Sequence, residues 1–116
     1  MAVITPVTAS MAGVNPAPAA ASGGGDSVNN ARGNTFLRVN NGGGGSINVT
    51  IAAQIATRPA DGTFPAMTLA NNVVAVPAGQ QRIIGPIPPA FNDSGGNAQI
   101  TYSGVTSVTV DALQVV

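Results

Sequence analysis

The chain has no histidine, cysteine, lysine, glutamate or tryptophan, and its charged side chains are four arginines and four aspartates in 116 residues. General acid–base catalysis near neutral pH normally uses histidine, glutamate, lysine or a perturbed aspartate. Soft metal sites need imidazole or thiolate ligands. Most catalytic chemistry is therefore closed to this chain, and we expect a protein that is not an enzyme and that binds no cofactor and no metal.

Charged and aromatic side chains are scarce: they make up 7% and 3% of the chain, and the formal net charge is zero. No basic patch could hold a phosphate backbone by counterion release, so nucleic acid is not an expected partner. So few aromatic rings disfavour the stacking surface that usually binds sugars or bases. A neutral chain also repels its own copies little, which favours a protein held in an assembly.

The absence of cysteine excludes a disulfide framework, so stability must come from packing, hydrogen bonding or association. No run approaches the roughly 18 apolar residues that span a bilayer, so we expect no membrane partner. The N-terminal residues 1–10 carry no basic side chain, and Thr5 and Pro6 interrupt their apolar stretch, so they do not resemble a secretory signal. We expect a protein made in the cytoplasm, or one exported by a route that the sequence does not show.

The first third of the chain differs in composition from the rest. Residues 12–30 are alanine, proline, glycine, serine and asparagine with few large apolar side chains, which predicts an extended arm or linker. Residues 2–8 place β-branched side chains around a proline, which suits an edge strand or a segment laid on a neighbour; a disordered tail is the alternative. We therefore predict one domain, with residues 1–30 as an extended N-terminal arm and residues 31–116 as the folded body.

From Asn34 onward, apolar and polar residues alternate with the period of two that is typical of β-strands. Turn residues separate the alternating segments, and none of them shows a convincing helical period. We predict an all-β fold with about 40% strand, namely a small β-sandwich or jelly-roll-like domain with an extended N-terminal arm. The predicted strands cover residues 35–40, 46–51, 72–76, 80–84, 98–103 and 107–115.

Three segments have features of their own. Residues 40–45 are two asparagines and four glycines, which tolerate positive φ, and are predicted to form a hairpin connection. Residues 85–91 are proline-rich and must run along the edge of a sheet or over its end. Near Ala112 the apolar phase of the last strand slips by one residue, which predicts either a bulge or a strand end that buries both faces.

Charged residues within strands are rare enough to be informative. Arg38 and Asp111 lie in the middle of predicted strands. Cross-strand pairing of arginine with aspartate would explain why they persist there, and an exposed pair of this kind contributes only about 0–1 kcal/mol. The alternative is that one of them reaches across a subunit interface. The other three aspartates lie in turn or linker contexts, so we expect no catalytic aspartate dyad.

Three stretches with turn glycines and alternating valines resemble small structural proteins of tailed bacteriophages, in particular capsid decoration (cement) proteins. They are NTFLRVNNGGGGSINVTI at residues 34–51, VAVPAGQQRIIGPIP at 74–88 and ITYSGVTSVTV at 100–110. The resemblance covers residues 32–116. It implies a β-sandwich or jelly-roll-like subunit, commonly a homotrimer, that lies on the capsid exterior of the virion and ties neighbouring major capsid protein subunits together without any catalytic residue.

The arm and the long connection over residues 54–71 are the expected contact segments, because such loops usually contact a partner and an extended arm can add a strand to a sheet edge of a sister subunit or the capsid. The expected partner-binding residues are apolar side chains of the arm and the loops: Val3, Ile4, Pro6, Val7, Phe64, Met67 and Phe91. Two alternatives stay open. One is a head completion or tail protein, and the other is a β-sandwich module that binds glycans or a host surface through Phe64 or Phe91.

Overall fold

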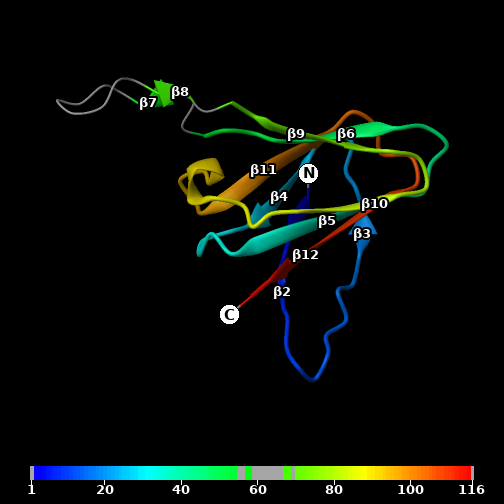
Figure 1. Ribbon diagram of the computed structural model, residues 1–116, viewed down its shortest axis with the longest axis horizontal. Coiled ribbons are helices and arrows are strands. Elements are labelled where there is room, and N and C mark those ends of the chain that lie inside the picture. The colour runs from blue at the N-terminus through cyan, green and yellow to red at the C-terminus, as the bar shows by residue number, and fades with distance from the viewer. Residues whose placement is uncertain (1, 55–56, 59–66, 69, 116) are drawn as a thin grey trace.

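Valine, isoleucine and leucine at every second position give most strands one apolar face. The computed structural model describes residues 2–54, 57–58, 67–68 and 70–115, and in it two mixed sheets form two layers (Figure 1). The apolar faces of these sheets pack into one core. The predicted all-β sandwich is confirmed. Strands make up 46% of the chain, near the predicted share of about 40%.

The two main sheets, A and B, each contain five strands. Sheet A consists, in spatial order, of β1 (Ala2–Ile4), β4 (Asp26–Asn29), β11 (Asn97–Tyr102), β6 (Ile47–Ile51) and β9 (Asn72–Val76). Sheet B consists, in spatial order, of β10 (Gln81–Ile84), β5 (Thr35–Asn41), β12 (Val108–Gln114) and β2 (Val7–Thr8), and β3 (Ala19–Ala20) also pairs with β12. A small separate pair, β7 (Thr57–Arg58) and β8 (Met67–Thr68), lies between β6 and β9 in the chain.

One core fills the space between the sheets. Its side chains come from alternate positions of the strands, as in β5, where Leu37 and Val39 are completely buried. Burying a side chain of this size contributes about 1.5–3 kcal/mol, so this alternation drives the packing of the sheets. The core residues are Ala21, Val28, Leu37, Val39, Ile47, Val49, Ile51, Val76, Ile84, Ile87, Phe91, Ala98, Ile100, Val108, Val110 and Ala112.

The glycine-rich segment between β5 and β6 crosses from sheet B to sheet A. The prediction of a hairpin here was wrong, because β5 pairs with β10 and β12, whereas β6 pairs with β9 and β11. The buried Asn41 holds the crossing in place. Its amide N–H groups donate to the carbonyls of Gly45 (2.8 Å) and Val76 (3.0 Å), and its Oδ1 accepts from the N–H of Gly43 (3.0 Å). One satisfied amide therefore links the loop to both sheets.

The final strand, β12, keeps a continuous register against β5 along its whole length. Of the two predicted explanations for the phase slip, the bulge is therefore wrong. Both faces are buried in the middle of the strand but not at its end, where Leu113 and Gln114 are half-buried and Val115 is 48% exposed. Asp111 and Ala112 point to opposite faces and are only 3% and 1% exposed.

The proline-rich segment after β10 runs over one end of the sandwich (Figure 1), as predicted. The N–H of Ile87 donates to the carbonyl of Thr35 (2.9 Å), which ties this segment to the start of β5. A 3-10 turn, η1 (Pro89–Phe91), then brings the chain to β11. Ile87 and Phe91 enter the core from this segment.

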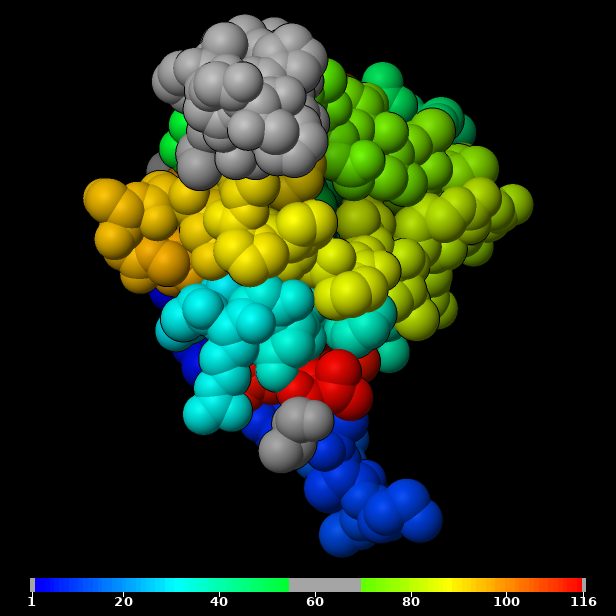
Figure 2. Space-filling view, turned by 60° about the vertical axis from the view of Figure 1, so that its left-hand side comes forward, coloured from blue at the N-terminus to red at the C-terminus, as the bar shows by residue number. Residues whose placement is uncertain are grey.

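The first 30 residues contribute strands to both sheets. β1 pairs with β4, and β2 and β3 pair with β12. β4 is an inner strand whose Val28 is completely buried, so the division predicted at residue 30 does not match a break in the sheets. Residues 9–18, by contrast, form a loop that projects from the sandwich (Figures 1 and 2).

Candidate functional site

The apolar residues expected in the N-terminal arm lie along one side of the sandwich, where β1 and β2 form edges of the two sheets. Val3 on β1 is 69% exposed, whereas Ile4 packs against the core. Pro6 and Val7 are half-buried. The structure therefore brings these four together on one side of the molecule, with Val3 as the most accessible of them.

The three loop residues expected to contact a partner have different outcomes. Phe91 is 8% exposed and belongs to the core, so its ring is not a free contact on the surface. The reason is the 3-10 turn, which directs this side chain inward. Phe64 lies outside the described residues, as does the side chain of Met67, whose backbone begins β8.

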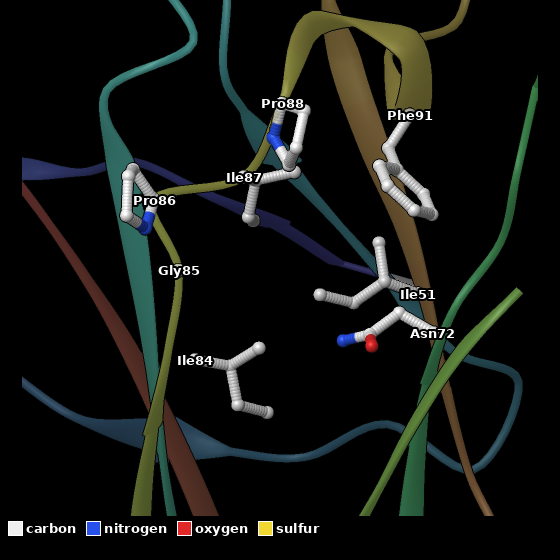
Figure 3. A pocket seen from close by; sticks show the side chains of 8 residues that line it. All are labelled: Ile51, Asn72, Ile84, Gly85, Pro86, Ile87, Pro88 and Phe91. Atoms are coloured by element: carbon white, nitrogen blue, oxygen red, sulfur yellow. The ribbon is translucent and has the colours of Figure 1, made fainter.

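An apolar pocket of about 280 Å³ opens between β9 and β10, under the proline-rich segment. Figure 3 shows side chains of Ile51, Ile84, Ile87 and Phe91 around it, with Asn72 as its polar side chain. The remaining lining residues are Gly85, Pro86 and Pro88. Since no ionisable group lines this pocket, it can receive an apolar group but cannot supply acid–base chemistry.

Asp26 is the most deeply buried carboxylate of the described chain, at 1% exposure. Its Oδ1 accepts from the N–H of Ala2 (3.1 Å), and its Oδ2 accepts from the N–H of Ser22 (3.2 Å) and from the Tyr102 hydroxyl (2.8 Å). Burial alone would raise the pKa of Asp26, but the hydrogen bonds from Ser22, Tyr102 and Ala2 outweigh it and lower that pKa. This carboxylate anchors β1 to the sheet.

Tyr102 supports the same anchor. Burial, together with the adjacent Asp26 carboxylate, raises the pKa of its hydroxyl well above the ordinary value. The hydroxyl is therefore the donor in its hydrogen bond to the Asp26 carboxylate.

Arg38 and Asp111 form the cross-strand ion pair that the sequence predicts. They lie directly opposite each other on β5 and β12. The Arg38 Nε and Nη2 donate to the two carboxylate oxygens of Asp111 at 2.9 and 2.7 Å. The Asp111 side chain is 4% exposed and that of Arg38 is 30% exposed. The pair is neutral as a unit, so this position offers no free charge to an ionic ligand.

Asp93 organises the turn before β11. Its carboxylate accepts from the N–H groups of Asn97 (3.1 Å) and Gly95 (2.8 Å) and from the Gln99 side chain (2.7 Å). These bonds, the one from Asn97 foremost, lower the pKa of Asp93. Within the part of the chain that the structure describes, no three acidic, histidine or cysteine side chains gather into a metal site. The helical structure in that part is also too short to cross a membrane.

The outer faces of the two sheets differ in polarity. The outer face of sheet A carries polar side chains on β6 and β11: Asn48, Thr50, Asn97, Gln99 and Thr101. On sheet B, Phe36, Leu113 and Val7 lie side by side across β5, β12 and β2. Ile83 on β10 lies opposite Arg38 and is 65% exposed. We call these four apolar side chains, Phe36, Leu113, Val7 and Ile83, the sheet B strip.

Comparison with protein family models, curated proteins and solved structures gave no match. The resemblance to decoration proteins therefore stays an expectation from the sequence, and the function must be argued from the surface of the molecule. The strongest feature of that surface is the sheet B strip, which sequence reasoning missed. The available signal was Phe36, because it stands at a position where alternation with Leu37 and Val39 calls for a polar residue.

Proposed function

We propose that this chain is a non-enzymatic structural protein of a virion. It decorates the capsid of a tailed bacteriophage as a homotrimer and stabilises it by bridging major capsid protein subunits. The observation that carries the proposal is the sheet B strip, an apolar row on the outer face of sheet B in which Ile83 is exposed and Phe36, Leu113 and Val7 are half-buried. Exposed apolar patches on soluble proteins commonly mark interaction surfaces.

The charge distribution supports an apolar rather than an ionic attachment. The charged side chains on the outer face of sheet B, Arg38 and Asp111, already neutralise each other within the chain. A partner that covers the strip therefore buries no unpaired charge, which would be costly. Each strip is small, so several must act together. A cyclic trimer supplies that multivalency, because three modest contacts made at once give retention that one contact cannot give.

The N-terminal residues add a second contact of a different kind. β1 forms the edge of sheet A, and Val3 on it is exposed. An edge strand can pair with an extended segment of a partner, with backbone hydrogen bonds giving affinity. Because β3 and β4 belong to the sheets, a test of this contact must remove residues 2–8 and not residues 1–30.

The test of the proposed function is co-sedimentation with shells of the phage that encodes the chain, stripped of this protein. Ile83→Asp places a charge in the strip, and we expect it to weaken attachment at least tenfold, or about 1.4 kcal/mol. Val73→Asp is the matched control, because Val73 is a similarly exposed aliphatic residue (56%) on the edge strand of the other sheet. Equal retention of the two variants would contradict a role for the strip.

The same assay separates the alternatives. A head completion or tail protein would bind isolated connectors or tails and leave the shell faces bare. A glycan-binding module would bind sugars and leave shells alone. The core position of Phe91 removes one of the two aromatic rings on which the glycan hypothesis depended.

A further inference from the structure

We propose that residues 2–8 are exchanged between copies of this chain. In the assembled homotrimer, β1 and β2 of one copy lie on β4 and β12 of the next copy, in the places that they occupy here on their own chain. This inference rests on the proposed homotrimer and specifies how its subunits are joined. The partner is a second copy of this chain.

The contacts of residues 2–8 can be transferred as a set. β1 makes a parallel pairing with β4, and β2 makes a parallel pairing with β12. Two further hydrogen bonds join the same elements: Ala2 N–H to Asp26 (3.1 Å) and Gln114 Nε2 to the Thr8 hydroxyl (2.8 Å). None of these contacts requires the two segments to come from one chain. A second copy offers the identical groups, which makes exchange a low-cost route to association.

The loop that follows β2 is long enough to reach a neighbour. Thr8 pairs with Gln114, and Ala19 pairs with Val110, four positions away along β12. That separation is about 13 Å at the usual rise of a strand. The connecting residues 9–18 could span about 33 Å when extended. The difference of about 20 Å lets residues 2–8 leave their own sheets without disturbing β3 or β12.

The loop over residues 9–18, as it lies on its own chain, makes few packing contacts. Met11 at its tip is 105% exposed and Val14 is 40% exposed, so their apolar side chains are not packed. The loop also has a left-handed backbone at Ala17, with φ of +38°, which the Cβ of alanine disfavours. Figure 2 shows the loop standing away from the body of the molecule.

The absence of native cysteine allows a direct test. Thr8 and Gln114 are paired and their side chains touch, so Thr8→Cys with Gln114→Cys in one chain can form a disulfide. After mild oxidation of the full-length trimer, we expect covalent dimers and trimers on a non-reducing gel, converted to monomers by reductant. The matched control is Asn48→Cys with Ala75→Cys, a pair across β6 and β9 that must close within one chain.

The native mass of the same sample, measured by light scattering, distinguishes failure of the proposed homotrimer from failure of the proposed exchange of residues 2–8. A trimer in which the cysteines at positions 8 and 114 form only intrachain disulfides would contradict the proposed exchange of residues 2–8. It would leave the proposed homotrimer unaffected. A monomer at every concentration with intrachain disulfides overturns both. If the first variant does not fold, Val7→Cys with Leu113→Cys tests the next pair of the same ladder. Interchain disulfides from either pair support the exchange.

Discussion

Asp26 is the residue whose chemistry most affects the N-terminal strand. Its carboxylate accepts hydrogen bonds from Ala2, Ser22 and Tyr102, which belong to three different parts of the chain. All three donors are neutral, so these contacts stabilise the charge of Asp26 by hydrogen bonding. The consequence is a lowered pKa in the folded state and a dependence of stability on pH.

The sign of this dependence follows from the direction of the shift. Because folding lowers the pKa of Asp26 from 3.8, the stabilisation is fully present above pH 3.8 and is lost as the pH falls through the folded value. Urea unfolding at a series of pH values should therefore show a falling free energy of unfolding only below pH 3.8. Asp93 has a lowered pKa as well and contributes in the same direction.

Asp26→Asn isolates the contribution of this residue. The variant cannot titrate at position 26, so its free energy of unfolding should fall less steeply with acid than that of the native chain. An identical acid slope in both proteins would contradict the role of Asp26. The matched control is Asp93→Asn, which removes the other shifted carboxyl without touching β1.

The Arg38–Asp111 pair makes a second prediction at this scale. Arg38→Met leaves the buried carboxylate of Asp111 without its cation, which should cost about 1–3 kcal/mol, between the values for exposed and fully buried pairs. The double variant Arg38→Met with Asp111→Leu should recover most of that loss, because two apolar side chains bury no charge. Denaturant unfolding measures both, and a double variant less stable than Arg38→Met would contradict this account.

At the scale of the elements, the sequence predicts strands well where valine and isoleucine alternate with polar residues. The segments around Ile47 and Val108 are strands close to their expected bounds. Which strands pair could not be predicted, because asparagine and glycine suit a hairpin and an inter-sheet crossing equally. The crossing depends on the Asn41 side chain reaching Val76, a residue distant in the sequence.

The strand β4 was missed for a related reason. Its four residues, Asp26–Asn29, contain a single large apolar side chain and follow a run of glycines, so no period of two is visible. Its place in the sheet comes from its neighbours: Val28 packs in the core, and β1 and β11 flank it. The sheet B strip was missed because the apolar character of this outer face appears only when four strands, β10, β5, β12 and β2, are aligned.

Alanine substitutions at two valines measure whether the N-terminal residues belong to the fold. Val28→Ala removes a fully buried side chain and should lower the free energy of unfolding by about 2–3 kcal/mol. Val3→Ala changes an exposed side chain on the neighbouring strand and should change it by less than about 0.5 kcal/mol. Similar small effects at both positions would mean that β4 is not part of the core.

At the scale of the whole molecule, a small core and scarce charge favour association through apolar surfaces over association through ionic contacts. The chain has one sandwich, and its sheet B strip and N-terminal residues lie on surfaces that a partner can cover. Such surfaces gain affinity from buried apolar area and strand pairing, and salt affects both much less than it affects ionic contacts. We therefore expect assembly through several weak, neutral contacts acting together.

The measurement that tests this account most directly is attachment of the native chain to undecorated shells over a range of salt concentrations. We predict saturable binding whose affinity changes less than about threefold between about 50 and 500 mM salt, because screening acts on charge and the contacts are neutral. Failure to bind the shells, or binding that salt abolishes, would contradict decoration of a capsid through neutral apolar surfaces.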